Sequence, residues 1–227
     1  MKPELRRVGE CQAPVVVIDD FSGDAETIVA VAEALAPYEP SGNYYPGLRR
    51  VIGEADEPAN DYVERTCQDA AQFIAGAFDV DGFDLVEASF SMVTAKPTEL
   101  NLAQRAPHFD STDPKYFALL HYLQVPNGTA TAFYRQRSTG IELVTSTNAS
   151  TFIDTAEAET AALPLDSGYI QGSNQFFEQI GAVEAIPDRL IIYQGSLLHS
   201  GIIPVGMNLS SDPRIGRLTA NFFLRGH

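Results

Sequence analysis

The order of hydrophobic and polar residues divides this chain into an early helical part and a later part rich in strands. Val15 to Ile18 form a run of β-branched residues, which predicts a buried strand. Ser22-Gly23-Asp24 then offers a helix cap, and apolar residues recur at helical spacing until Pro37. A second helix is predicted to begin at Pro58, because proline is favoured at the first helical position. Its apolar face would comprise Val63, Cys67, Ala70, Ile74, Ala77 and Phe78.

Residues 39–50, between these helices, are rich in Gly, Pro and Tyr and are predicted to form a loop. From residue 85 onward the pattern changes to β-branched and aromatic segments, and turn signals such as Pro126-Asn127-Gly128 separate several of them. One short acidic helix is expected over residues 154–162. Helices followed by many antiparallel strands indicate an α+β fold that is mainly β, with the helices against one face of a sandwich or barrel. The predicted strands cover residues 85–94, 117–125, 129–134, 189–193 and 217–223.

Composition and charge narrow the class of protein further. A length of 227 residues suits a single domain over residues 1–227, and 44% hydrophobic residues are enough for a packed core. The chain carries 30 acidic and 15 basic residues, for a formal net charge of -15. Because such a surface repels phosphate groups, we expect no nucleic acid and no membrane among its partners. An anionic ligand would need a local cluster of basic side chains.

The chain also carries signals that bear on its location. No apolar run approaches the roughly 20 residues of a membrane helix, and Met1 to Arg7 are not followed by the apolar stretch of a signal peptide. The two cysteines, Cys11 and Cys67, fit reduced thiols, although one bridge between them stays possible. We therefore expect a soluble cytoplasmic protein, and the sequence leaves its oligomeric state open.

Histidines are scarce in this chain, so few combinations could form a metal site. Residues two apart on a strand face the same side, so His108 and Asp110 can converge on one ion. His199 follows the predicted strand 189–193 by a short segment. Two histidines and one carboxylate leave open positions on a metal, which suits non-haem Fe(II) oxygen chemistry. Taken singly, His108 and Asp110 also fit an ordinary surface pair, and His199 also fits a structural histidine in a turn.

The last predicted strand alternates between polar and apolar residues. Its polar face carries Arg217, Thr219 and Asn221. An arginine grips a carboxylate through two parallel hydrogen bonds, and a hydroxyl two residues further on can add a third. This face therefore fits an anion site, while an edge strand that turns its polar face to water is the alternative.

These motifs jointly point to one family. His108-x-Asp110, His199 and Arg217-x-Thr219 resemble the His-x-Asp…His…Arg-x-Ser/Thr pattern of the Fe(II)/2-oxoglutarate-dependent oxygenases. Further segments resemble the prolyl-hydroxylase-like branch in the same order, so the resemblance covers roughly residues 14–226. They are Val15 to Phe21, Ala118 to Leu123, Gly128 to Tyr134 and Pro204-Val205.

The resemblance implies a double-stranded β-helix, a jelly roll of the cupin type, with the N-terminal helices packed on one sheet. It implies a dioxygenase that hydroxylates a small-molecule or peptidyl substrate with dioxygen and releases succinate and CO2. Fe(II) would be bound by His108, Asp110 and His199. The cosubstrate 2-oxoglutarate would be bound by Arg217, Thr219 and Tyr122.

Two departures from the family pattern affect the predicted site. Residues 207–213 look like an insertion before Arg217, which makes Arg214 a rival for the cosubstrate carboxylate. The segment Thr94 to Pro97 lacks the tyrosine that often contacts the cosubstrate in this family. Three further residues are predicted to line the mouth and meet the substrate, with solvated surface side chains as the alternative: Arg49, Tyr45 and Arg135.

Two other functions are compatible with the same residues. Three ligands with open positions also serve a Zn(II) or Mn(II) hydrolase or isomerase on a related barrel. Such an enzyme would not need Arg217 and Thr219 to face the metal. A non-catalytic binding module could keep the same barrel, although it would keep the three ligands without a reason.

Overall fold

The computed structural model describes residues 1–42, 44–164 and 166–227. Its α-helices are α1 (Ala25–Ala34), α2 (Glu57–Phe78) and α3 (Ala149–Ala161). Its strands are β1 (Lys2–Val8), β2 (Ala13–Asp19), β3 (Glu39–Pro40), β4 (Gly47–Val51), β5 (Phe83–Val93), β6 (Tyr116–Gln124), β7 (Ala130–Gln136), β8 (Phe177–Glu184), β9 (Arg189–Gln194), β10 (His199–Ile202) and β11 (Leu218–Gly226).

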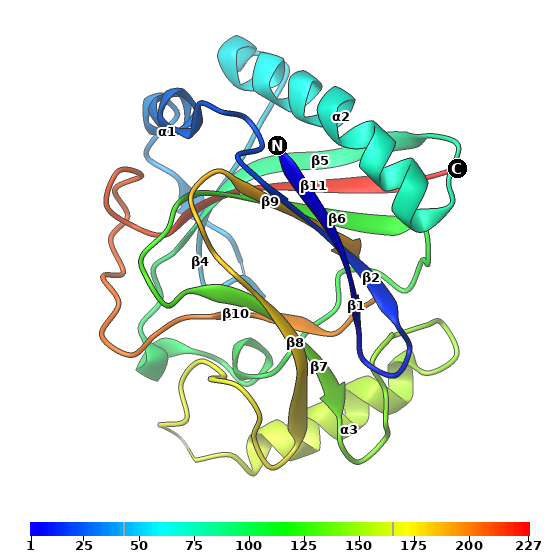
Figure 1. Ribbon diagram of the computed structural model, residues 1–227. Coiled ribbons are helices and arrows are strands. Elements are labelled where there is room, and N and C mark those ends of the chain that lie inside the picture. Colours follow the sequence, from blue (N-terminus) through cyan, green and yellow to red (C-terminus); the bar gives the residue numbers. More distant parts are fainter. Residues whose placement is uncertain (43, 165) are drawn as a thin grey trace.

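These strands form two antiparallel sheets that lie one above the other (Figure 1). The larger sheet has eight strands in the order β1-β2-β9-β6-β11-β5-β4-β3. The smaller sheet has three, in the order β10-β7-β8. The prediction of a mainly β fold with helices is confirmed at this level.

Helices α1 and α2 cover the outer face of the larger sheet (Figure 1). The Asp24 side chain accepts a hydrogen bond from the Thr27 N–H and caps α1, as the sequence predicts. Pro58 lies in the first turn of α2, and the predicted residues Val63 and Ile74 are buried against the sheet. The main hydrophobic cluster of the described residues therefore lies between these two helices and the sheet.

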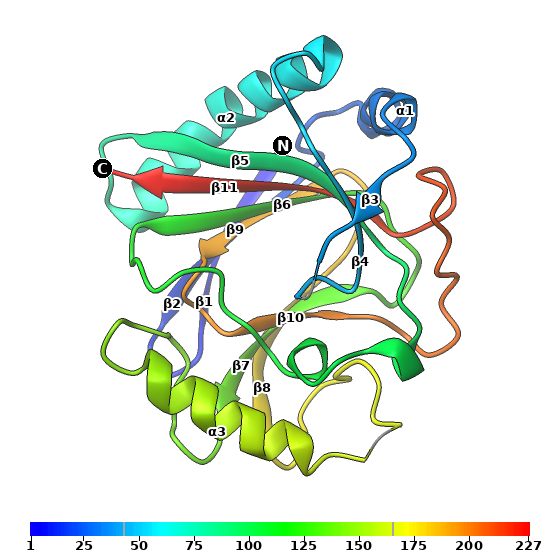
Figure 2. The same ribbon diagram turned by 180° about the vertical axis from the view of Figure 1, so that it is seen from behind.

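Because side chains alternate along a strand, the inner face of the larger sheet carries other residues than the face that the helices cover. On β11, Leu218, Ala220 and Phe222 join the helix-side cluster, so Thr219 and Asn221 point toward the smaller sheet. A second hydrophobic cluster fills part of the space between the sheets. It includes Tyr122, Val15, Val17, Phe133, Ile191 and Tyr193. Helix α3 covers the outer face of the smaller sheet (Figure 2). Buried polar residues on β11 are thus enclosed between two sheets.

Several elements differ from the sequence predictions. The segment 39–50 contains β3 and β4 rather than only a loop, because Arg49 pairs with Ser91 on β5. Strands β1, β8 and β10 were not predicted, and α3 begins at Ala149 rather than at residue 154. The exposed residues of β1 show no apolar alternation, so only its pairing with β2 makes it a strand.

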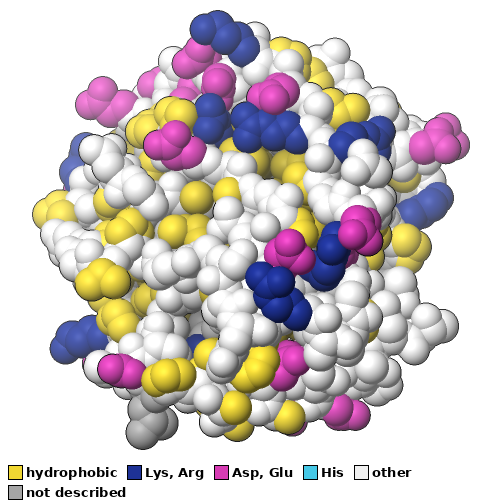
Figure 3. Space-filling view, turned by 60° about the horizontal axis from the view of Figure 1, so that its bottom comes forward, with side chains coloured by type: hydrophobic (Ala, Val, Ile, Leu, Met, Phe, Trp, Pro, Cys, Tyr) yellow, Lys and Arg dark blue, Asp and Glu magenta, His cyan; other side chains and the backbone are white. Residues whose placement is uncertain are grey.

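Charged side chains of both signs are spread over the surface. On the face in Figure 3, acidic and basic side chains lie interspersed rather than in one broad patch of either sign. Cys11 and Cys67 are both free, so the structure contains no bridge between them. Among the described residues, none of the helices combines the length and the apolarity that crossing a bilayer requires.

Candidate metal centre

His108, Asp110 and His199 are brought together by pairing between two distant segments of the chain. His108 and His199 form an isolated antiparallel bridge, in which each N–H donates to the other's carbonyl at 2.9 Å. The Asp110 N–H donates to the carbonyl of Gly195 at 2.7 Å. The candidate ligand atoms of the three side chains all lie within 4.8 Å of one another. The structure therefore gathers the three residues that the sequence singled out.

Gly195 makes the close approach of Asp110 possible. A Cβ atom at this position would lie 3.2 Å from Asp110 Cβ and 2.8 Å from Tyr116 Cδ1. Any larger residue would push one of these side chains away. Tyr193, two residues earlier on β9, packs edge-on against the His199 ring at 4.8 Å between centroids. Neither residue was predicted to belong to the site, although both lie just before His199 in the sequence.

The hydrogen bonding of His199 fixes its tautomer. Nδ1 lies 2.7 Å from the Leu197 carbonyl, which can only accept, so Nδ1 carries the proton. Nε2 therefore presents a lone pair, and it lies 3.6 Å from Asp110 Oδ2. Burial lowers the pKa of His199 to about 4. Its ring is thus neutral at pH 7, the form that binds metals.

His108 has the same protonation state. Loss of hydration, assisted by the neighbouring His199, lowers the pKa of His108 to about 4, although part of the residue is open to solvent. The two imidazole rings lie 4.3 Å apart between centroids. Two neutral rings so close together present their lone pairs without mutual repulsion of charge.

Asp110 is the least satisfied of the three side chains. Its Oδ2 atom is buried and has no hydrogen-bond partner among the described residues. Burial raises the pKa of this carboxyl to about 6. A buried carboxylate without a donor costs free energy, and a cation held between it and the two histidines removes that cost. These residues therefore fit a divalent metal ion.

Arg217, directly before β11, has similarly unmet bonding capacity. It is 4% exposed. Its Nε atom is buried without a partner, and no ion pair involves Arg217 within the described part of the chain. The guanidinium lies 5.9 Å from the centre of the Tyr122 ring. A buried, unpaired cation is costly, so this position fits an anion.

The other predicted cosubstrate residues surround Arg217. Thr219 pairs in register with Tyr122 on β6 and with Ser91 on β5. The Tyr122 hydroxyl donates to Thr131 Oγ1 at 2.7 Å, and the Thr219 hydroxyl donates to Asn221 Oδ1 at 3.3 Å. Arg217, Thr219 and Tyr122 thus share one buried polar pocket.

Tyr45, which was predicted to line the mouth, has its hydroxyl near Arg217 and Thr219. Its hydroxyl is buried and makes no hydrogen bond to any described residue. Burial raises the pKa of Tyr45, while the charges of Arg217 and Arg49 oppose the rise, so the phenol lies near both. A tyrosine from the segment before β4 thereby lies beside Arg217, whereas residues 94–97 offer none.

The two other arginines predicted at the mouth have different surroundings. The Arg49 Nε–H donates to Ser91 Oγ at 3.2 Å. The Arg49 charge adds to the lowering of the His108 pKa and opposes the rise that burial causes in the Asp110 pKa. Arg135 instead pairs with three carboxylates, at 2.5, 3.0 and 3.7 Å, from Glu142, Glu10 and Glu178. The structure thus places Arg49 beside the metal centre and gives no support to a substrate contact by Arg135.

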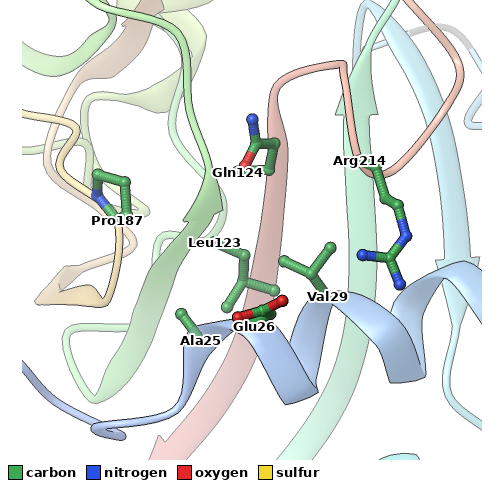
Figure 4. A pocket seen from close by; sticks show the side chains of 7 residues that line it. All are labelled: Ala25, Glu26, Val29, Leu123, Gln124, Pro187 and Arg214. Carbon is green, nitrogen blue, oxygen red and sulfur yellow. The ribbon is translucent and has the colours of Figure 1, made fainter.

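Arg214 does not compete with Arg217 for the pocket between the sheets. Its Nε–H donates to Glu33 on α1 at 2.6 Å. Arg214 lines a separate pocket of about 330 Å³ with Glu26, Val29 and Gln124, outside the larger sheet (Figure 4). The insertion at residues 207–213 therefore carries Arg214 to the helix side.

Comparison with solved structures defines the class of fold. The chain is similar to HygX from Streptomyces hygroscopicus with iron bound (15% identity, TM-score 0.54, 94% of this chain and 82% of that chain). It is also similar to a 2OG-Fe(II) oxygenase-family oxidoreductase from Burkholderia pseudomallei (12%, 0.51, 94% and 84%). A third structure, the non-heme alpha-ketoglutarate-dependent epimerase SnoN from nogalamycin biosynthesis, matches with 13% identity and a TM-score of 0.53 over 93% and 78% of the two chains.

These likenesses show that the chain has the fold of the Fe(II)/2-oxoglutarate oxygenases, and they confirm the resemblance read from the sequence at that level. The chain belongs to the family described as a family of unknown function (DUF6445), whose model matches residues 1–224. No curated protein sequence matches it.

Proposed function

We propose that this protein is an Fe(II)- and 2-oxoglutarate-dependent dioxygenase that hydroxylates a substrate C–H bond. One observation carries the proposal: a carboxylate oxygen without a partner lies within reach of two neutral histidines, and a buried, unpaired guanidinium lies near the same side chain, Tyr193, as that carboxylate. A metal ion would satisfy Asp110, and a carboxylate of the cosubstrate would satisfy Arg217. In this proposal the two facing sheets are the halves of a double-stranded β-helix.

The metal would be held by His108, Asp110 and His199, with Nε2 of His199 as its ligand atom. When bound, iron and 2-oxoglutarate supply oxidation by dioxygen, coupled to decarboxylation to succinate and CO2. The Leu197 carbonyl keeps the Nδ1 proton of His199 in place and so keeps Nε2 available. The bridge between His108 and His199 holds the backbone of the two residues side by side, so their rings start from neighbouring positions.

Arg217 would pair with the distal carboxylate of 2-oxoglutarate. Because the guanidinium is buried, little water competes for its N–H groups, and the pairing is stronger than it would be at the surface. The hydroxyls of Thr219, Tyr122 and Tyr45 lie around the same pocket. In a chain with a net charge of -15, this local positive charge is what admits a dianion.

An anaerobic titration tests the proposal. Fe(II) is added to the purified protein and 2-oxoglutarate follows, and a visible metal-to-ligand absorption band should form only when both are present. Admission of air should then convert 2-oxoglutarate to succinate. If neither the band nor succinate is observed, the proposal is wrong.

Arg217→Gln separates the two ligands. The affinity for 2-oxoglutarate should fall by about 100-fold, because the variant removes one partner of a buried charged pair that contributes roughly 3 kcal/mol. Fe(II) affinity should not change. Both constants are obtained from the same anaerobic titration, with Arg214→Gln as the matched control. Equal losses of both affinities would show that the assignment of Arg217 is wrong or that the variant misfolds.

A Zn(II) or Mn(II) hydrolase remains the competing function. It would need no buried guanidinium beside the metal, so Arg217 would have no explained role. Metal analysis of the purified protein, combined with activity measured under nitrogen, separates this function from the oxygenase.

A further inference from the structure

The inward side chains of β11 change in character along the strand. Arg217 directly before the strand, then Thr219 and Asn221, are polar, and Phe223 follows on the same face. The Phe223 ring stacks on Tyr116 of β6, with the centroids 5.7 Å apart and an interplanar angle of 25°. The end of this face that lies away from Arg217 is therefore an aromatic surface, which we call the aromatic wall (Tyr116 and Phe223).

The aromatic wall borders the metal centre. Tyr116 Cδ1 and Asp110 Cβ both lie close to the point that a Cβ of Gly195 would occupy, at 2.8 and 3.2 Å. Burial, together with the charge of Asp110, raises the pKa of Tyr116 to about 12, so the phenol is neutral at pH 7. A hydrocarbon group packed on this wall would lie beside the candidate ligand Asp110, on the side away from Arg217.

Arg49 lies between Tyr45 and the aromatic wall, and few of its N–H groups have a close partner. Its guanidinium is 5.2 Å from the centre of the Tyr45 ring and 5.9 Å from the centre of the Phe223 ring. Its Nε–H donates to Ser91 Oγ at 3.2 Å, whereas its terminal nitrogen NH1 reaches Glu87 only at 3.5 Å. That second bond is long for a charged pair, and both side chains remain partly exposed, at 25% and 33%. A better-placed carboxylate can therefore displace Glu87.

The nearby charges limit the anion that Arg49 can accept. Glu87 stays close by, so a ligand with two negative charges would face repulsion that a single charge largely avoids. A planar carboxylate also matches the two parallel N–H groups of the guanidinium. The site thus favours one carboxylate joined to a hydrophobic body.

We propose that Arg49 and the aromatic wall form the binding site for the primary substrate, and that this substrate is a monocarboxylate with an aromatic or aliphatic body. Its carboxylate pairs with Arg49, and its body packs on Phe223 and Tyr116 beside the metal centre. The inference rests on the proposed oxygenase function and names the class of substrate for it.

Calorimetric titration under nitrogen tests the inference. The protein is loaded with Fe(II) and saturating 2-oxoglutarate, and the probes are phenylacetate and its neutral analogue phenylacetamide. Phenylacetate should bind at least about 10-fold more tightly, as expected for hydrogen bonds to a charged group. Arg49→Gln should abolish the preference, and Glu87→Gln should increase phenylacetate affinity several-fold. Arg137→Gln, which removes an exposed arginine elsewhere, should leave the preference unchanged.

The outcomes separate this inference from the proposed function. If the Fe(II)/2-oxoglutarate absorption band fails to form in the wild-type protein, the proposed function itself is wrong. If the band forms but the two probes bind equally, or neither binds, the substrate assignment is wrong and the oxygenase proposal survives. If Arg49→Gln weakens 2-oxoglutarate instead of the probe, Arg49 belongs to the cosubstrate pocket and the inference is overturned.

Discussion

Two clusters each hold a histidine and an aspartate in close contact, one on the helix side of the larger sheet and one between the two sheets, and they differ in whether their polar atoms have partners. On the helix side, His121 Nδ1 lies 2.7 Å from the Tyr62 hydroxyl and Nε2 lies 3.0 Å from Asp188 Oδ1. Asp188 also accepts hydrogen bonds from the N–H groups of Ser22 and Gly23. Both ring nitrogens and both carboxylate oxygens of this cluster therefore have partners.

The cluster between the sheets lacks such partners. Asp110 Oδ2 has no hydrogen bond to any described residue, and the lone pair of His199 Nε2 faces that carboxylate. Burial lowers the histidine pKa in both clusters, so the direction of the shift does not distinguish them. The clusters differ instead in whether their polar atoms have hydrogen-bond partners. His121 ties α2 to β6, as expected for a structural residue, whereas His199 is positioned to bind a ligand.

The comparison predicts the largest effect for His199→Ala. Fe(II) affinity should fall by more than about 100-fold, because even residues that only orient metal ligands contribute 10- to 100-fold. The free energy of unfolding of the metal-free protein should fall by only about 1–2 kcal/mol, because the variant loses the Nδ1–H bond to the Leu197 carbonyl and the ring contact with Tyr193. Metal titration and urea denaturation check the two expectations. A large loss of stability without loss of metal affinity would mean that the His199 side chain is structural.

His121→Leu should show the opposite behaviour. The substitution leaves the Tyr62 hydroxyl and the Asp188 carboxylate without their shared partner, so the free energy of unfolding should fall by about 3 kcal/mol. The folded fraction should keep its Fe(II) affinity. Urea denaturation gives the first quantity and metal titration the second. Loss of metal affinity in a folded variant would contradict the proposed division between the two clusters.

The effect of Asp110→Asn on the free energy of unfolding should depend on pH, and this dependence tests whether Asp110 lacks partners. The pKa of Asp110 is raised from 3.8 to about 6, so its stabilising contribution is present below pH 4 and is lost as pH rises through 6. Asparagine carries no charge. The metal-free variant should therefore be more stable than the wild type by about 3 kcal/mol at pH 7, and the difference should vanish near pH 4.

Urea denaturation at several pH values measures this difference. With saturating Fe(II) at pH 7 the order should reverse, because only the wild type gains stability from the metal. An unchanged difference from pH 4 to pH 7 would show that Asp110 does not ionise in an unfavourable environment.

Much of the fold could be predicted from sequence, because strands β5, β6, β7, β9 and β11 and the first two helices carry their own apolar patterns. Strands β3 and β4 do not, since only their pairing defines them. The same limit applies to the site. Residue type and spacing singled out His108, Asp110, His199 and Arg217, but left each of them ambiguous, and only the family resemblance decided between the alternatives.

The remaining site residues depend on contacts between distant segments. Tyr45 reaches the pocket because the segment before β4 folds back beside Thr219, and Gly195 matters because Asp110 passes close to it. The surroundings of Arg135 could not be predicted for the same reason. Its three carboxylate partners come from β8 and from segments outside the strands, and no local sequence pattern predicts these contacts.

The backbone bridge between His108 and His199 has a consequence for the proposed metal site. Two main-chain hydrogen bonds hold the backbone of both residues in place in the metal-free chain. Binding of an ion would then order mainly side chains and would incur a small entropic penalty. Under the proposed function the polypeptide could lose its metal and regain it without refolding, so oxidised or scavenged iron would be replaceable during the lifetime of one molecule.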